Sequence, residues 1–210
     1  MPPYEVIDQT VVVGGESFQI RVLKNRNQYD DPDGSHEAAG VAPASWPMFG
    51  KLWPAGLILA ELMARSELHN LRILELGCGL GLASMMAMRG GAEVVASDVH
   101  PLAEEFLAYN TARNGIDDVD FRQMDWRNHN SLGQFDLIMG SDILYEPAHP
   151  LQLAKTISRH ALPVGRAIIA DAGRGLMSPF KHSMADRGWV SVTDSVLNNK
   201  LVRLSRRVGG

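Results

Sequence analysis

The stretch that most constrains the fold runs from residue 72 to residue 98, RILELGCGLGLASMMAMRGGAEVVASD. Its first five residues, Arg72–Leu76, are mostly apolar and β-forming, which predicts a buried strand of a parallel sheet. Glycines at alternate positions then allow sharp turns and let a ligand approach the backbone closely. A helix-forming run and a second apolar run follow, and Asp98 ends the latter. The order predicts strand, glycine loop, helix, strand, and a carboxylate beside the loop.

The spacing of the glycines argues against a dinucleotide. The dinucleotide fingerprint is G-x-G-x-x-G/A, and here its last position holds Leu82 or Ser84, depending on the glycine from which the count starts. The run reads E-x-G-x-G-x-G, and Glu75, two residues before Gly77, is a poor neighbour for a pyrophosphate. An acid at this position suits a ligand with an ammonium and a sulfonium and no phosphate. Asp98 can then accept hydrogen bonds from both hydroxyls of a ribose.

With these features the sequence resembles the class I methyltransferases that depend on S-adenosylmethionine. The resemblance implies that the cofactor is S-adenosyl-L-methionine and that the product is S-adenosyl-L-homocysteine. It also implies that the glycine loop, here Gly77, Cys78, Gly79 and Gly81, contacts the cofactor together with Glu75, Asp98 and Val99.

The rest of the chain supplies the elements of such a fold. Strands are expected at residues 119–124, 135–140, 166–170, 189–195 and 201–208, and helices from Pro54, over 99–114, over 149–160 and over 178–187. Residues 163–165 are expected to form a turn. Together with the resemblance, this predicts an α/β fold with a doubly wound, Rossmann-like seven-stranded sheet, mostly parallel with a C-terminal antiparallel hairpin.

Two segments of this chain carry more specific expectations. In the helix from Pro54, apolar residues at helical spacing are expected to face the sheet, namely Leu57, Ile58, Leu62 and Met63. Asn110 is expected to brace a neighbouring loop from its helix.

The N-terminal part precedes the cofactor unit. Residues 4–13 and 17–23 are β-rich and separated by Gly14-Gly15-Glu16, which predicts an N-terminal β-hairpin. Residues 24–45 are polar and rich in Asp, Gly and Pro, which predicts a mobile loop that is either a lid over the site or a plain connection. We therefore expect one domain, in which residues 1–45 are an accessory and residues 46–210 bind S-adenosylmethionine.

A narrower resemblance is carried by LWPAG, ELGCGLG, SD, DW and SDILY between residues 46 and 160. These motifs are similar to the seven-β-strand protein-lysine methyltransferases of the methyltransferase-like 21 type. The resemblance implies that Trp53, Trp126 and Ser141 contact the cofactor and that Asp142 and Tyr145 border the methyl acceptor. Asp125 is expected to accept a hydrogen bond from the adenine amine, with Trp126 against the base.

The acceptor of a methyl group must present a lone pair. A lysine amine has an ordinary pKa of about 10.4, so its site needs desolvation and a route for the proton. We expect Asp142 to orient the incoming ammonium and Tyr145 to narrow the methyl channel, which makes these two residues the catalytic candidates. An alternative for Asp142 is a helix N-cap after the strand.

Composition limits which classes of protein, partner and cellular location the sequence allows. The chain has 210 residues, 45% hydrophobic and 21% charged, enough for one α/β domain with a full core. A formal net charge of −4 and a pI of about 6.0 disfavour a nucleic-acid partner. The single cysteine and the expected lack of a signal peptide indicate a cytoplasmic protein. The most apolar stretch is too short to span a membrane. The seven scattered histidines predict no metal site.

The acceptor is the least constrained element. The motifs favour a lysine side chain of another folded protein, and acids in the loop would attract a basic partner, namely Asp30, Asp31, Asp33 and Glu37. A small heteroaromatic amine like nicotinamide is the alternative, enclosed by Trp46, Phe49 and Tyr145. A third possible function is that of a cofactor-binding scaffold without activity.

The oligomeric state that we expect for the protein is a monomer.

Overall fold

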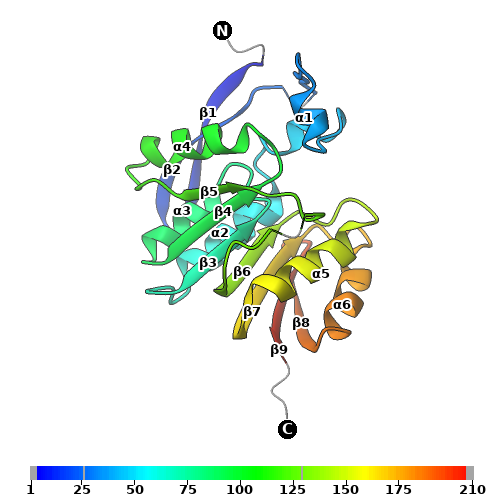
Figure 1. The fold of residues 1–210 in the computed structure, drawn as a ribbon. Helices are drawn as coiled ribbons and strands as arrows, with labels where there is room; N and C mark the ends of the chain where they lie inside the picture. The colour runs from blue at the N-terminus through cyan, green and yellow to red at the C-terminus, as the bar shows by residue number, and fades with distance from the viewer. Residues whose placement is uncertain (1–3, 26, 129, 207–210) are drawn as a thin grey trace.

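The computed structural model describes residues 4–25, 27–128 and 130–206. In this part of the chain the centre is a seven-stranded sheet of order β5-β4-β3-β6-β7-β9-β8 (Figure 1). The first five strands in this order pair in parallel, and β9 pairs antiparallel with both β7 and β8. The strands are β3 (Arg72–Leu76), β4 (Glu93–Asp98), β5 (Asp120–Gln123), β6 (Phe135–Ser141), β7 (Ala161–Asp171), β8 (Trp189–Val196) and β9 (Asn199–Arg206). The expected fold class is confirmed.

The chain reverses its direction of winding between β3 and β6. From β3 it proceeds outward through β4 to β5 and then returns to β6 on the other side of β3. Ligands bind at such a switch point, beyond the carboxyl ends of the strands. The glycine loop follows β3 and residues 142–145 follow β6, so both predicted motifs lie at this edge.

Helices cover both faces of the sheet (Figure 1). One core joins α2 (Pro54–Ala64), α3 (Leu82–Arg89) and α4 (Ala103–Arg113) to the sheet, and the other joins α5 (His149–His160) and α6 (Met177–Ala185) to it. Burial on both faces explains why the parallel strands read as continuous apolar runs.

An N-terminal hairpin lies outside the main sheet. β1 (Val6–Val13) pairs with β2 (Glu16–Leu23) in the expected antiparallel register, and apolar residues of the hairpin join the core under α2 to α4. Asn110 of α4 accepts a hydrogen bond from the Arg21 amide at 2.7 Å and donates one to the Leu80 carbonyl at 3.1 Å. It therefore braces the glycine loop, as expected.

Several boundaries differ from the expected ones. The helix after Asp98 begins at Ala103 rather than near residue 99, because the His100 imidazole accepts a hydrogen bond from the Leu102 amide and holds a turn there. The expected turn at 163–165 lies inside β7 as an irregularity in its pairing with β6. The strand expected over residues 201–208 is β9, and residues 207 and 208 lie outside the described residues.

The prediction of which α2 residues face the sheet was partly wrong. Met63 is buried as expected, but Leu57, Ile58 and Leu62 are only partly buried. The fully buried positions are Ala55, Leu59 and Ala60. The helix is apolar nearly all round, so its periodicity does not define which side packs on the sheet.

The segment after the hairpin has structure of its own. A short helix α1 (Ser35–Ala38) and a 3-10 turn (Trp46–Met48) lie within or next to it. Trp46 is fully buried and donates a hydrogen bond from Nε1 to His36 Nδ1 at 2.6 Å. No helix in the described ranges is both long and apolar enough to span a bilayer.

Candidate active site

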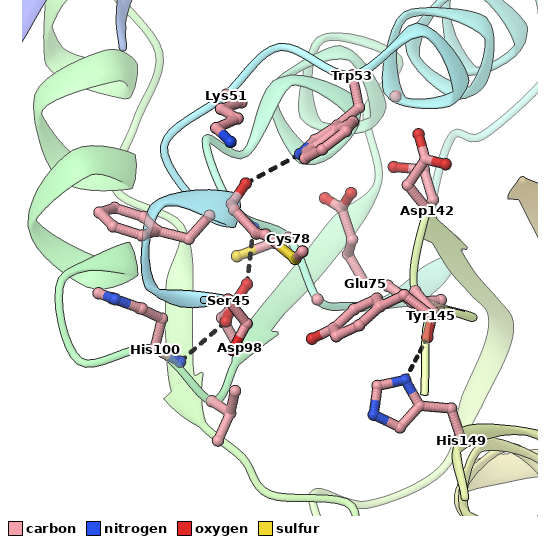
Figure 2. Close-up of a pocket in the computed structure, with 18 of the residues that line it drawn as sticks. Ser45, Lys51, Trp53, Glu75, Cys78, Asp98, His100, Asp142, Tyr145 and His149 are labelled. Carbon is pink, nitrogen blue, oxygen red and sulfur yellow. Dashed lines mark hydrogen bonds between the residues drawn. The ribbon is translucent and has the colours of Figure 1, made fainter. Parts of the chain in front are cut away.

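A pocket opens at the switch point, between the glycine loop and the carboxyl ends of β4 and β6 (Figure 2). Almost all the residues predicted from the sequence line it: Trp53, Glu75, Gly77, Cys78, Gly79, Asp98, Val99, Asp125, Trp126, Ser141, Asp142 and Tyr145. Gly81 does not line it. Gly81 is the N-cap residue of α3 with a left-handed φ of 76°, and a Cβ there would also lie 2.0 Å from Leu107 Cδ1 of α4.

The glycine loop has the conformation that its sequence demands. Gly77 and Gly79 have φ angles of 66° and 51°, in the left-handed region that glycine adopts without strain. A Cβ at Gly79 would lie 2.8 Å from the Phe49 carbonyl oxygen. The loop backbone is therefore held close to the segment before α2.

Asp98 stands at the end of β4 and is 9% exposed. Its Oδ2 accepts a hydrogen bond from the Gly79 amide and its Oδ1 one from the His100 amide, both at 2.9 Å. Burial raises the pKa of Asp98, and these amides oppose the rise. Each carboxylate oxygen has two acceptor sites, so both retain capacity for ligand hydroxyls.

Glu75 lies between Trp53 and Tyr145 in the view of Figure 2. It is 2% exposed, and its Oε2 accepts hydrogen bonds from the amide and the hydroxyl of Ser84. Burial raises the pKa of Glu75 to about 7, because the Ser84 hydrogen bonds offset only part of the desolvation. Neither Glu75 nor Asp98 forms an ion pair with any described residue. Two buried acids without a cation suit a cationic ligand.

Asp125 and Trp126 follow β5 on the pocket wall. Both carboxylate oxygens of Asp125 accept from Arg127, Oδ1 from its amide at 2.8 Å and Oδ2 from its Nε at 2.7 Å. Burial tends to raise the pKa of Asp125, but Arg127 outweighs it and the net shift is downward. The Trp126 ring meets the His149 ring edge-on, with centroids 5.2 Å apart.

Trp53 is the N-cap residue of α2 and closes another side of the pocket. Its Nε1 donates to the Met48 carbonyl at 2.9 Å. Lys51 Nζ lies 5.5 Å from the centroid of the ring. The 3-10 turn before α2 therefore fixes the orientation of Trp53.

Asp142 has a left-handed φ of 54° at the end of β6 and is 7% exposed. Its Oδ1 accepts from Arg174 Nη2 at 2.6 Å and from the Ala172 amide at 3.3 Å. Burial raises the pKa of Asp142, whereas Arg174 and the amides of Ala172 and Ala55 oppose the rise. The alternative role as N-cap of the following helix is wrong, because α5 begins at His149 after Ala148.

Tyr145 and His149, which follow β6, form another part of the pocket wall. Their rings are edge-on with centroids 4.5 Å apart, and His149 Nδ1 lies 2.9 Å from the Ile143 carbonyl oxygen. Burial raises the pKa of Tyr145 to about 12 and lowers that of His149. Both side chains are therefore neutral near pH 7.

Ionisable lining residues that had not been predicted from the sequence include His100, Arg127, His149 and Arg174. His149 is the first residue of α5, the helix expected over residues 149–160, but nothing in the sequence showed that its ring turns toward Tyr145. Arg174 carries no signal in the sequence, because its place depends on how the loop after β7 folds back. Within the described residues no group of three or more His, Cys, Asp or Glu side chains gathers to hold a metal.

The fold and the pocket define a class I methyltransferase architecture, and the comparisons agree. The chain belongs to the family described as lysine methyltransferase, whose sequence model matches residues 47–174. A solved structure of the same fold is the T. thermophilus 16S rRNA N2 G1207 methyltransferase RsmC in complex with AdoMet and guanosine. It has a TM-score of 0.70 and 16% identity, over 99% of this chain and 52% of that one.

Two curated relatives are similar to this chain. The electron transfer flavoprotein beta subunit lysine methyltransferase of Xenopus laevis is 28% identical over 159 residues, which are 73% of this chain and 64% of the relative. The protein N-lysine methyltransferase METTL21A of Xenopus tropicalis is 33% identical over 101 residues, 45% of this chain and 46% of the relative. The matches therefore span about half to two thirds of these relatives.

Proposed function

We propose that the protein is an S-adenosylmethionine-dependent N-methyltransferase whose acceptor is a lysine side chain of another protein. The observation that carries the proposal is one continuous pocket with two ends. Asp98 lies at one end and Asp142 at the other, with Glu75 and the Tyr145 side chain between them (Figure 2). Family membership and the lysine methyltransferase relatives support the same reaction.

The residues of the pocket fit the cofactor. The positive φ of Gly79 and its contact with Phe49 leave no room for a side chain where the backbone would meet a ligand. Asp98 would accept from the ribose hydroxyls, and the buried Glu75 would pair with the ammonium. Val99, Asp125 and Trp126 would surround the adenine. The bound cofactor supplies an electrophilic methyl group on a sulfonium.

The acceptor end has the properties that a lysine amine needs. Methyl transfer is an in-line displacement, so the protein must hold the amine lone pair in line and exclude water. Tyr145 is neutral and partly buried, and presents a ring and a hydroxyl beside the channel. Asp142 would attract the ammonium, and the apolar surroundings would favour loss of its proton.

The small heteroaromatic acceptor has less support. The aromatic enclosure expected from Trp46, Phe49 and Tyr145 is not assembled, because Trp46 is fully buried behind the pocket. Phe49 stacks on the His100 ring, with centroids 3.9 Å apart, rather than standing free for a ligand.

The loop acids also support a protein acceptor only in part. Asp31 accepts from the His36 and Glu37 amides, and Asp33 from the Ser35 amide, so both stabilise the start of α1. Gly40, Val41 and Ser45 of the same segment line the pocket. We propose that the acids of this segment attract a basic partner surface. We further propose a cytoplasmic location, in line with a single, buried and unpaired Cys78.

The test is transfer of radiolabel from S-adenosylmethionine into a cell lysate separated by size. We expect one discrete protein band to carry label and to release methyl-lysine on hydrolysis. Asp98→Ala protein in the same lysate serves as the matched control and should give little label. Label confined to the small-molecule fraction, or methyl-arginine in the band, would refute the lysine assignment.

A further inference from the structure

The acceptor end of the pocket already contains a cation from the chain itself. The Arg174 guanidinium donates from Nη2 to Asp142 Oδ1 at 2.6 Å. The Asp142 side chain is 4% exposed and the Arg174 side chain 34%. The carboxylate is therefore fixed in the interior, while its partner reaches it from the rim.

The loop after β7 delivers this guanidinium from an anchored backbone. Asp171, the last residue of β7, accepts from the Gly173 amide at 2.6 Å and from the Arg174 amide at 3.4 Å through Oδ1. Gly173 and Gly175, on either side of Arg174, have φ angles of 79° and 89°. The backbone turns tightly here, and the long Arg174 side chain can change rotamer without moving it.

The position of Arg174 combines a carboxylate with an aromatic face. Its Cζ lies 5.6 Å from the centroid of the Trp53 ring. Cations are attracted to such a face within about 6 Å, and most strongly to tryptophan. An alkylammonium group entering the pocket would be stabilised by the same two partners.

The ion pair with Arg174 satisfies only one oxygen of the Asp142 carboxylate. Oδ2 of Asp142 and Oδ2 of Asp171 are both buried and have no hydrogen-bond partner among the described residues. Buried polar atoms are nearly always hydrogen-bonded, so such atoms require a reason. The Arg174 guanidinium leaves Asp142 Oδ2 without a partner, and an ammonium with three donors is compact enough to approach both oxygens of this carboxylate.

We propose that Arg174 occupies the position of the acceptor ammonium in the free protein and leaves it when a primary alkylammonium, the end of a lysine side chain, binds. Arg174 is thus a specificity-determining residue. An acceptor must compete with the chain's own cation for Asp142 and Trp53, which selects against neutral and weakly basic groups. The inference rests on the proposed function for the identity of the ligand, but the competition is measurable without turnover.

The experiment measures binding of n-butylammonium chloride, a lysine side-chain mimic, to protein saturated with S-adenosylhomocysteine. Sodium chloride at matched concentration controls for ionic strength. We expect Arg174→Gln to bind n-butylammonium at least about fivefold more tightly than the unaltered protein, with unchanged affinity for S-adenosylhomocysteine. The matched control is Arg203→Gln, which removes another guanidinium paired with an aspartate, Asp194, on the exposed β8-β9 hairpin. It should behave like the unaltered protein.

Two results would overturn the inference. Equal or weaker n-butylammonium binding by Arg174→Gln would show that Arg174 supports the site rather than competes for it. A loss of S-adenosylhomocysteine affinity in this variant would assign Arg174 to the cofactor. If S-adenosylhomocysteine does not bind the unaltered protein, the proposed function fails, and the same titration on the free protein still tests the competition.

A second measurement does not depend on the variant folding. The Arg174 Nε–H resonance of the unaltered protein should shift, and its hydrogen should exchange faster with water, when n-butylammonium is added. An unchanged resonance at saturating n-butylammonium would contradict displacement.

Discussion

The Asn110 side chain joins the glycine loop to the N-terminal hairpin through its two hydrogen bonds, Nδ2 to the Leu80 carbonyl at 3.1 Å and Oδ1 from the Arg21 amide at 2.7 Å. Asn110 is fully buried. The hairpin is therefore connected to the cofactor loop even though it lies outside the main sheet. This connection gives the accessory segment a role in shaping the pocket.

Asn110→Ala should lower both stability and ligand affinity. Leaving the Leu80 carbonyl and the Arg21 amide unpaired should cost about 1 to 3 kcal/mol in the free energy of unfolding. The freed glycine loop should also weaken S-adenosylhomocysteine binding, measured by calorimetry. Asn114→Ala is the matched control, because Asn114 bonds to Gln19 of the same hairpin at 2.8 and 2.9 Å but not to the loop. It should lose stability and keep its affinity, and equal loss of affinity in both variants would contradict the prediction.

Asp98→Ala should weaken cofactor binding. Removing a charged acceptor of ribose hydrogen bonds should cost about 1.5 to 3 kcal/mol in affinity. The change also removes the acceptor of the Gly79 and His100 amides. Calorimetry with S-adenosylhomocysteine measures the affinity, and circular dichroism checks the fold. Unchanged affinity in a folded variant would place the ribose elsewhere.

Asp142→Ala should separate binding from turnover. S-adenosylhomocysteine affinity should remain near normal, because Asp142 lies at the other end of the pocket from Asp98 (Figure 2). The rate of labelling of the acceptor band should fall, since the ammonium loses its carboxylate. If the variant instead unfolds while activity per folded molecule is unchanged, Asp142 acts only on structure.

The segment from residue 27 to residue 45 should exchange its amide hydrogens more slowly when S-adenosylhomocysteine and then an acceptor bind. Gly40, Val41 and Ser45 line the pocket, so a ligand bound there would contact the segment directly. Hydrogen exchange followed by mass spectrometry measures this, with the distant β8-β9 hairpin as internal control. Identical exchange in the free and ternary states would make the segment a plain connection.

Much of the fold follows from the sequence because each local pattern agrees with the global one. The glycine loop, Asp98 and the apolar strands between residues 72 and 140 specify the switch point directly. The side of α2 that packs on the sheet could not be read, since a helix that is apolar nearly all round has no distinct face. The irregularity within β7 was read as a turn because Pro163 and Gly165 give the same signal in both.

The site was predictable where motif and strand end coincide, as at Glu75, Asp98 and Asp142. It was not predictable where a loop from a distant part of the chain supplies the side chain. Arg174 is 32 residues from Asp142, and their contact depends on the backbone turns at Gly173 and Gly175. The role of His100 could not be predicted for another reason: its ring stacks on Phe49, a contact between two distant parts of the chain.

Glu75 should make both stability and cofactor affinity depend on pH. Its pKa in the folded protein is about 7 and its ordinary value is 4.5, so the folded state holds the proton more tightly than the unfolded state. The free protein should therefore lose stability as pH rises from about 4.5 through 7, by up to about 3 kcal/mol. Affinity for S-adenosylhomocysteine, whose ammonium pairs with the ionised carboxylate, should rise over the same interval.

Glu75→Gln tests both trends, because the amide cannot ionise and still accepts the Ser84 hydrogen bonds through its carbonyl oxygen. Denaturant unfolding of this variant between pH 5 and pH 8 should show a much smaller loss of stability than the unaltered protein. Its affinity for S-adenosylhomocysteine should be lower at pH 8 and nearly independent of pH. The direction in which stability changes with pH decides the question, because a carboxylate held ionised by its surroundings would instead stabilise the protein as pH rises. A free protein that gains stability between pH 5 and pH 7, with the gain abolished in Glu75→Gln, would show that Glu75 is stabilised as a charge without the cofactor.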